Sequence, residues 1–550
     1  MSNEAWRNAQ IGFARHLIQA GRLDVAQDAL GAIEGAAPDV PLARIWCELG
    51  SALFALERYY ETETAFLAAL SLLPEDAEAS LGLGYALFNQ ARLQEAAALF
   101  EGLAARPEAG AAAFRALGAA RLNLFDTGGA GEALIKALSL DENDAESHAL
   151  KGVLAYRSAN VELRWRDWTR QNLADPKARP DFTASVLAKP ALESALESIE
   201  AARRIDPRIR TDELGARLLV ASGRPEAALQ FLAESPVPDA RTWQLMADVS
   251  WLLRDEVQAK AYLRKSFETR SEQTAQPIGL GVLNESLPLV AAGLEKRRQA
   301  TVSGTPLVWV HWDAPPHFAQ SVAGAVACCP NSPLAVIGDS SNAFAVCRHR
   351  QMVSCASSAW EFLERYQHRS ENDFVYEAFC LMRWFLLRDW AEAERVEQLM
   401  TLDSDILLFA DAEREIVPRL GGHDFAFTGP MGPHLCLLTR NGLRELCGFF
   451  MDSYAKTIPQ SQDQTTDMTL LPRFLANRAW SDLSAVKDGA RVDMNIRQSE
   501  GFDMAGEAKD IQFKEGRAYA RRSGTNERVR FLALHFQGPA KHLMRTALTS

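Results

Sequence analysis

An apolar run at residues 399–409 is interrupted by two acidic residues and reads Leu-Met-Thr-Leu-Asp-Ser-Asp-Ile-Leu-Leu-Phe. The apolar residues on both sides predict a buried strand. Burying the carboxylates of Asp403 and Asp405 without partners would cost several kcal/mol. We therefore expect a cation to compensate their charge, and a divalent metal ion that also binds a phosphorylated substrate would do so.

Short apolar runs alternate with helical segments on both sides of this stretch. The sequence predicts strands at residues 307–312, 334–339, 399–402 and 425–428, and a helix at 374–390. This alternation indicates a Rossmann-like α/β domain with a mainly parallel sheet, which we assign to residues 305–550. Ligands bind beyond the carboxyl ends of the strands in such sheets. Asp339 and Asp403 are both expected at such ends.

The first 275 residues follow a different pattern, rich in Ala, Leu and Glu, with apolar positions at helical spacing. A 34-residue template repeats along them, with small residues at Gly50, Gly84 and Gly118 and aromatic residues at Phe66 and Phe100. This pattern resembles the tetratricopeptide repeat, in which a small residue lets helix A pack closely on helix B. The resemblance implies an all-α solenoid.

About seven helix pairs are expected from this pattern. The pattern is irregular near residues 160–190, which contain either an insertion or a degenerate repeat. Residues 276–304 are predicted to link the solenoid, at 1–275, to the α/β domain. A chain of 550 residues is long enough for such a multidomain organisation.

Composition excludes some classes of partner. The formal net charge of −12 argues against nucleic-acid binding by the whole chain. Residues 1–6 show no secretory signal, and no apolar segment approaches the length of a transmembrane helix. The eight cysteines form no CxxC pair, which is typical of reduced thiols. We therefore expect a cytoplasmic protein.

A second motif lies near the carboxyl end of the chain. A strand-like run at residues 531–536 contains His535, which is followed by Gly538 and Lys541 at intervals of three residues. Imidazole can supply a further metal ligand. Glycine would let the backbone approach a phosphate, and lysine would supply positive charge to it.

Together the two motifs resemble those of GT-A nucleotide-sugar glycosyltransferases. Asp403-x-Asp405 matches the DxD motif, and His535-x-x-Gly538-x-x-Lys541 matches the HxxGxxK motif of the family 8 retaining enzymes. The resemblance implies that Asp403, Asp405 and His535 bind Mn²⁺ or Mg²⁺, and that Lys541 contacts the donor diphosphate. The Pro-Trp that usually follows this lysine is replaced here by His542-Leu543.

Four further residues are expected to bind the donor nucleotide. His311 and Trp312 end the first predicted strand, where such enzymes begin their nucleotide pocket. Asp339 follows the second strand, where an acid often meets the base or ribose. Arg383, on the predicted helix, could reach the donor phosphates or an acidic partner.

The segment at residues 462–471 is similar to an Asp-Gln element that precedes a helix in this family. Aligning its apolar pair puts Asp467 near the reacting sugar, whereas the literal dipeptide puts Asp463 and Gln464 there. We favour Asp467. A helix N-cap is the competing explanation for either aspartate.

The sequence therefore predicts a metal-dependent glycosyltransferase that moves a sugar from a nucleotide diphosphate sugar to an acceptor hydroxyl, with retention implied by the resemblance. The repeats would bind a protein or peptide acceptor or partner. Whether the chain forms a homo-oligomer stays open. The alternative is a repeat-based scaffold or interaction protein that carries a catalytically inactive transferase domain.

Overall fold

The structure is a computed structural model that describes residues 3–33, 39–56, 58–90, 92–174, 187–235, 238–272, 288–299, 302–455 and 465–549. It divides into two compact units, Met1–Trp165 with Asp181–Ser235, and Arg166–Pro180 with Pro236–Ser550. The domain boundary predicted near residue 275 lies inside the second unit. The two units therefore do not coincide with the predicted domains. The predicted linker at 276–304 lies partly outside the described residues, and Pro288–Gln299 within it form helix α16.

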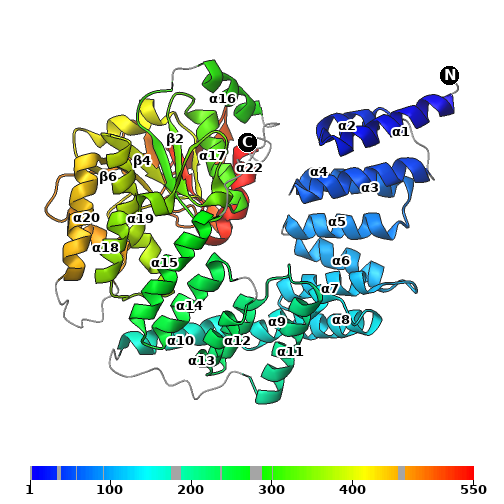
Figure 1. The fold of residues 1–550 in the computed structure, drawn as a ribbon. Helices are drawn as coiled ribbons and strands as arrows, with labels where there is room; N and C mark the ends of the chain where they lie inside the picture. Colours follow the sequence, from blue (N-terminus) through cyan, green and yellow to red (C-terminus); the bar gives the residue numbers. More distant parts are fainter. Residues whose placement is uncertain are drawn as a thin grey trace. The chain divides into compact units, whose positions relative to one another are not determined.

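The first unit is helical. Its helices are α1 (Asn3–Gln19), α2 (Leu23–Gly31), α3 (Val40–Ala55), α4 (Tyr59–Leu72), α5 (Ala77–Asn89), α6 (Leu93–Ala104), α7 (Ala111–Asn123), α8 (Thr127–Leu140), α9 (Ala145–Ser158), α11 (Lys189–Ile205), α12 (Asp212–Ala221) and α13 (Pro225–Ala233). They pack as α1/α2, α3/α4, α5/α6, α7/α8, α9/α11 and α12/α13, and the first four pairs stack in chain order (Figure 1). The predicted tetratricopeptide-like solenoid is confirmed for this unit.

A glycine in the first helix of a pair allows this close packing. A Cβ atom on Gly84 would lie 2.3 Å from the ring of Phe100, and one on Gly118 would lie 2.9 Å from Leu134. Both contacts are shorter than side chains tolerate, so the glycines let helices α5 and α7 approach their partners. This confirms the role predicted for the small residue of the repeat.

The irregular region contains an insertion. Helix α9 pairs with α11 rather than with α10 (Val161–Ala174), which lies between them in the chain. A Cβ on Gly152 of α9 would lie 2.7 Å from Ile199 of α11, so this pair repeats the glycine contact of the others. The division between the two units falls within α10.

Replacing Gly84 with Ala should destabilise the first unit by about 1–3 kcal/mol, since the added methyl group overlaps the ring of Phe100. Gly102 of helix α6 is the matched control, because a Cβ there meets nothing within 4 Å. Gly102→Ala should stabilise the helix by about 0.5–1 kcal/mol. Urea unfolding followed by circular dichroism measures both changes, and equal effects at the two positions would contradict the packing argument.

The second unit contains the end of α10, the helices that follow α13 and every strand of the described residues. Its helices are α14 (Ala240–Leu252), α15 (Glu256–Glu272), α16, α17 (Pro316–Cys328), α18 (Ser357–Arg365), α19 (Phe374–Ala393), α20 (Arg440–Ala455), α21 (Asp467–Leu475) and α22 (Met544–Thr549). Its strands are β1 (Leu307–Val310), β2 (Leu334–Gly338), β3 (Arg348–Gln351), β4 (Gln398–Leu402), β5 (Ile406–Leu408), β6 (Phe425–Phe427), β7 (Leu435–Thr439), β8 (Ser481–Asp482), β9 (Ala490–Val492), β10 (Met504–Ala505), β11 (Ala508–Lys509), β12 (Ile511–Lys514), β13 (Arg517–Arg521) and β14 (Arg528–His535).

The main sheet has the order β3-β2-β1-β4-β7-β6-β8. The first four strands run parallel, as the α/β pattern predicted. Strand β7 lies antiparallel to both β4 and β6, so the sheet is mixed. Only residues 428–434 join β6 to β7. A connection this short makes the second strand run antiparallel to the first.

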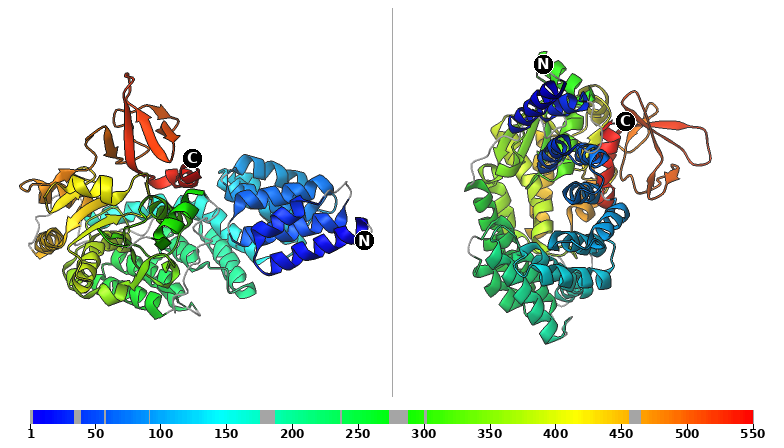
Figure 2. Two further views of the ribbon diagram at one scale, coloured as in Figure 1. Left: turned by 90° about the horizontal axis from the view of Figure 1, so that it is seen from above. Right: turned by 90° about the vertical axis from the view of Figure 1, so that its right-hand side faces the viewer.

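A second sheet, absent from the sequence prediction, has the order β12-β13-β14-β5, with β9 also paired to β14. Its orange and red strands project from the rest of the unit in Figure 2. Strand β5 belongs to this sheet whereas β4 belongs to the main one. The chain therefore changes sheets between Leu402 and Ile406, at the two aspartates.

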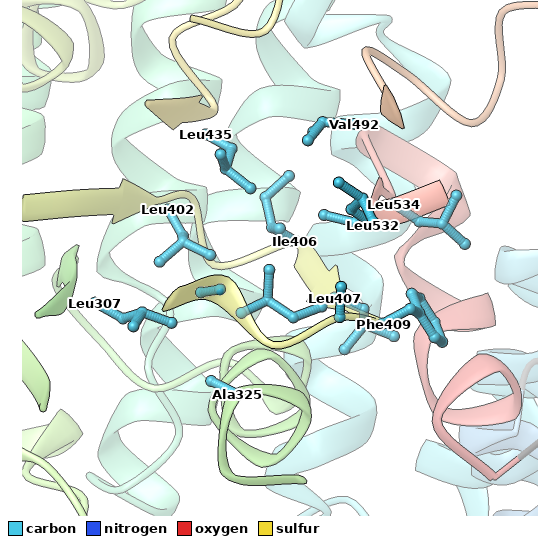
Figure 3. Close-up of a cluster of buried hydrophobic side chains, with 14 of the residues drawn as sticks. Leu307, Ala325, Leu402, Ile406, Leu407, Phe409, Leu435, Val492, Leu532 and Leu534 are labelled. Atoms are coloured by element: carbon cyan, nitrogen blue, oxygen red, sulfur yellow. The ribbon is translucent and has the colours of Figure 1, made fainter. Parts of the chain in front are cut away.

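One hydrophobic core joins the two sheets. Figure 3 shows Leu402 of β4, Ile406 of β5 and Leu435 of β7 near Val492 and Leu534 of the second sheet. All five side chains are buried. The residues on both sides of the turn between β4 and β5 are thus anchored in a core that contains apolar side chains from both sheets.

Helices α14 and α15 contact the α/β elements of their own unit. The carboxylate of Asp248 on α14 accepts a hydrogen bond from the backbone N–H of Val375 at 2.9 Å, and Val375 lies in the first turn of α19. Phe267 of α15 meets the rings of Trp312 and Trp360 edge to face. The last helix pair thus supports α19, which carries Arg383.

Among the described residues, none of the helices combines the length and the apolar composition needed to cross a membrane.

Candidate functional site

Asp403, Ser404 and Asp405 form a tight turn. The backbone N–H of Ile406 donates to the carbonyl of Asp403 at 3.2 Å, and Asp403 N–H donates to His434 O at 2.7 Å. The buried strand predicted from the apolar residues on both sides is therefore interrupted, since β4 ends at Leu402 and β5 begins at Ile406. The two carboxylates consequently have different partners.

Arg383 of helix α19 joins two carboxylates. Its Nη1 lies 2.6 Å from Asp403 Oδ1 and its Nη2 lies 2.8 Å from Asp467 Oδ2. Burial by itself lowers the pKa of the guanidinium, but the two aspartates raise it well above its usual range. For Asp403, burial is the stronger effect and raises the pKa of the carboxyl above its ordinary value, although Arg383 opposes it. Arg383 thus forms an ion-paired centre between the β4 end and α21.

Asp405 has two other cationic neighbours. Its Oδ1 lies 3.5 Å from His535 Nε2, at the end of β14, and its Oδ2 lies 3.3 Å from Lys541 Nζ. Burial would raise the pKa of Asp405, but these contacts hold it well below the usual range. For His535, burial lowers the pKa of the imidazole. Contact with Asp405 outweighs burial, so the pKa is raised overall. The fold therefore brings the two predicted motifs together at this carboxylate.

Two of the three predicted metal ligands, Asp405 and His535, face each other at this turn. His535 Nδ1 lies 2.6 Å from the carbonyl oxygen of Met494, which can only accept, so Nδ1 carries a proton and Nε2 faces Asp405. A carboxylate oxygen and an imidazole nitrogen are suitable ligands for Mn²⁺. Asp403, the third predicted ligand, is instead paired with Arg383. Over the described part of the chain, no three His, Cys, Asp or Glu side chains are grouped closely enough to hold a metal ion.

Gly538 and Lys541 lie on the short 3₁₀ helix Gly538–Leu543 that follows β14. Gly538 has a φ of 62°, the left-handed region that favours glycine. Lys541 is 37% exposed while its Nζ reaches Asp405. The glycine thus turns the backbone after His535 and brings the lysine back toward the acidic turn.

Asp467 is the first residue of α21, and it is not the N-cap. Thr466 is the N-cap, and it forms a capping box with Thr469. Asp467 is instead buried and paired with Arg383, and its predicted place near the reacting sugar stays a prediction. The other alignment used Asp463 and Gln464, which lie outside the described residues.

Three of the residues predicted to hold the nucleotide, His311, Trp312 and Asp339, lie at the ends of β1 and β2. Asp339 is 3% exposed, and its carboxylate accepts from the backbone N–H of Asp313 at 2.8 Å and from Arg270 Nη1 at 2.7 Å. The ring of Trp312 stacks on Phe379 with centroids 3.8 Å apart. Asp339 and Trp312 therefore have partners within the unit, and nucleotide binding by them stays a prediction.

His311 follows β1 as predicted, and its Nδ1 contacts the carbonyl of Asp313 at 3.2 Å. Burial lowers the pKa of its imidazole. The ring also lies beside Phe318, with centroids 4.9 Å apart. Burial thus favours the neutral form of the His311 imidazole, and its predicted contact with the nucleotide remains untested.

Two histidines of the site were missed in the sequence. His317, at the start of α17, lies 3.3 Å from Ser404 Oγ through its Nε2, and burial with the charge of Lys541 lowers its pKa to about 4. The ring of His434 stacks on that of His535 with centroids 4.1 Å apart. His317 follows Pro315-Pro316 and His434 precedes the apolar run at residues 435–438, and these positions were the available signal.

Glu377 is a third missed residue. It lies on α19, is 1% exposed, and accepts a hydrogen bond from Asn372 Nδ2 at 2.9 Å. Burial, followed by the charge of Asp467, raises the pKa of its carboxyl to about 7. A carboxyl with that pKa can exchange a proton near neutral pH. Glu377 lies within the helix predicted at residues 374–390, for which the sequence indicated a site role only at Arg383.

No protein-family model matches the chain, and no curated protein matches it. Among solved structures, a tetratricopeptide repeat protein from Parabacteroides merdae is 14% identical, with 48% of this chain and 93% of that chain covered and a TM-score of 0.35. The Cut9–Hcn1 hetero-tetramer of APC/C is 14% identical, with coverage of 48% and 43% and a TM-score of 0.32. MamA from Desulfovibrio magneticus RS-1 is 21% identical, with coverage of 36% and 97% and a TM-score of 0.27. The helix pairing and glycine contacts of the chain itself remain the basis for its repeats.

Replacing Arg383 with Met should destabilise the second unit by about 3–5 kcal/mol, because Asp403 and Asp467 lose their shared cation. Adding Asp403→Asn and Asp467→Asn to the same chain should restore most of this loss. The control is Arg388→Met, also on α19, where a half-buried guanidinium meets Asp389 at 3.3 Å and the expected loss is below about 1 kcal/mol. Chemical denaturation measures all three variants, and a wild-type midpoint for Arg383→Met would contradict the assignment.

Proposed function

We propose that the second unit transfers a sugar from a nucleotide diphosphate sugar to an acceptor hydroxyl, and that the repeats of the first unit bind a polypeptide acceptor or partner. One observation carries the enzymatic part of this proposal. Asp403, Asp405, His535 and Lys541, drawn from two motifs far apart in the sequence, meet at the carboxyl end of β4. Ligands bind at such strand ends in open α/β sheets.

In the proposed reaction the bond between the anomeric carbon and the leaving phosphate oxygen breaks, and a bond to the acceptor oxygen forms. The acceptor proton passes to the leaving diphosphate, so no strong general base is required. Lys541 and Arg383 stabilise the negative charge that develops on the diphosphate. Asp467, held by Arg383, orients the sugar or stabilises positive charge at the anomeric carbon. Retention follows from the family resemblance.

Asp405 and His535 would hold the divalent cation, and Asp403 would join them if it left Arg383. A bound Mn²⁺ or Mg²⁺ would neutralise charge on the diphosphate. The orientation of His535, with Nε2 toward Asp405, supports this role. Metal ligands are commonly oriented in this way by a hydrogen bond at the other ring nitrogen.

The helical repeats support the second part of the proposal. Stacked helix pairs form extended surfaces that suit peptides and proteins. In a chain that also carries a transferase, such a surface would recruit the polypeptide to be glycosylated, or it would join the enzyme to a partner.

A second candidate is an interaction protein whose transferase domain is inactive. The ion pairs favour it, because Arg383, His535 and Lys541 already compensate the carboxylates of Asp403 and Asp405. A site filled by internal cations has less need of a metal ion. The two candidates make opposite predictions about nucleotide binding.

Purified full-length protein should hydrolyse at least one nucleotide diphosphate sugar when Mn²⁺ is present. Asp405→Asn should reduce metal-dependent nucleotide binding at least about tenfold, since it removes a charge that faces both His535 and Lys541. Asp452→Asn, on the exposed side of α20, is the matched control and should bind as the wild type does. Isothermal titration with nucleoside diphosphates and a hydrolysis assay over a panel of donors supply the measurements.

Absence of binding and hydrolysis for every donor tested would reject the transferase and leave the interaction protein. Transfer of labelled sugar to a polypeptide, with the Asp405→Asn chain as the blank, would support the role proposed for the repeats.

A further inference from the structure

Lys509 of strand β11 is a fully buried cation behind the candidate site. Its side chain is 0% exposed, as is that of Asp493. Nζ donates to Asp493 Oδ1 at 2.7 Å, to the carbonyl of Asn495 at 2.7 Å and to Glu500 Oε1 at 3.0 Å. An ammonium group has three protons, and each of them has an acceptor here. Such complete pairing is what a buried charge requires.

The segment around Lys509 is a loop, residues 493–500, that folds over the ammonium group. Arg491 also contacts Glu500, so two cations and two carboxylates balance each other. Glu500 has a φ of 46°, a conformation that residues other than glycine seldom adopt. The Lys509 N–H donates to Ile496 O at 2.8 Å and fixes the loop at a further point.

This loop holds His535 at three atoms. Asp493 Oδ2 accepts from the backbone N–H of His535 at 3.3 Å, and the N–H of Ile496 donates to the carbonyl of His535 at 2.9 Å. Met494 O accepts from Nδ1 of the ring at 2.6 Å. All three contacts come from residues 493–496, which the ammonium group of Lys509 holds in place through Asp493 and Asn495.

We propose that Lys509 is a positioning residue for His535. Its ammonium group shapes the loop at 493–500, the loop fixes the proton on Nδ1, and Nε2 is thereby presented toward Asp405. What Nε2 then binds, a divalent cation, rests on the function proposed above. The positioning itself depends only on the geometry of this unit.

A purely structural role for Lys509 is the alternative, and a measurement on His535 itself separates the two. The test uses the full chain with ¹⁵N-labelled histidine, and the tautomer of each ring is measured by long-range ¹H–¹⁵N NMR. The His535 signal is identified by its loss in His535→Gln. In the neutral form of the wild-type His535 ring we expect a single tautomer, with the proton on Nδ1.

Lys509→Met removes the charge and leaves Asp493 unpaired, so this variant can fail to fold. Lys509→Met with Asp493→Asn removes both members of the pair and keeps the oxygen that accepts from the His535 N–H. In either variant that folds, we expect a mixture of His535 tautomers and a Mn²⁺ affinity reduced about tenfold to a hundredfold. Lys509→Arg should restore part of both properties because it keeps the charge. Lys514→Met, an exposed lysine on β12, should change neither.

A folded double variant with the wild-type tautomer and Mn²⁺ affinity would overturn the proposal. If the wild type binds no Mn²⁺ but the His535 tautomer still changes with Lys509, the positioning role stands and the metal-dependent function fails. The two proposals can therefore fail separately.

Discussion

The turn between β4 and β5 must place carboxylates at the point where the chain passes from one sheet to another. Leu402 and Ile406, on either side, belong to a core that both sheets share, so the turn cannot move into solvent without exposing them. The charge of Asp403 and Asp405 is compensated within the unit by Arg383, His535 and Lys541. These cations come from α19, β14 and the helix after β14. The arrangement of the second unit thus depends on balancing charge at one turn.

Helix α19 connects the ion pairs at this turn to other elements of the second unit. Its middle carries Arg383 between two aspartates, and a backbone N–H in its first turn donates a hydrogen bond to Asp248 on α14. Helix α15 adds Arg270, which pairs with Asp339 at the end of β2. The last helix pair is repeat-like in sequence, yet it supplies polar contacts to the first turn of α19 and to the end of β2. Its role is therefore tied to the site rather than to the solenoid.

The first unit depends on a different physical constraint. Its helix pairs need close approach, and a glycine opposite a large side chain provides it in α5, α7 and α9. Each contact lies within one pair, so the solenoid is stabilised by interactions between neighbours. Charge plays a smaller part there, because its ion pairs, such as Arg92 with Glu63 and Glu95, lie near the surface.

The sequence by itself determined the repeats, the parallel strands β1, β2 and β4, helix α19 and the approach of two motifs to one site. The repeats, the strands and the helix follow from periodic burial and from glycine spacing, which are properties of local stretches. The meeting of the two motifs was what the family resemblance implied. Only the tertiary structure decided the turn at Asp403, the second sheet, the insertion at α10 and the roles of His317, His434, Glu377 and Lys509. The partners of a charged side chain lie on elements far away in the sequence: Arg383 meets Asp467 across 84 residues. Periodicity indicates which face of an element is buried, but the pairing of charges is set only when distant elements pack together.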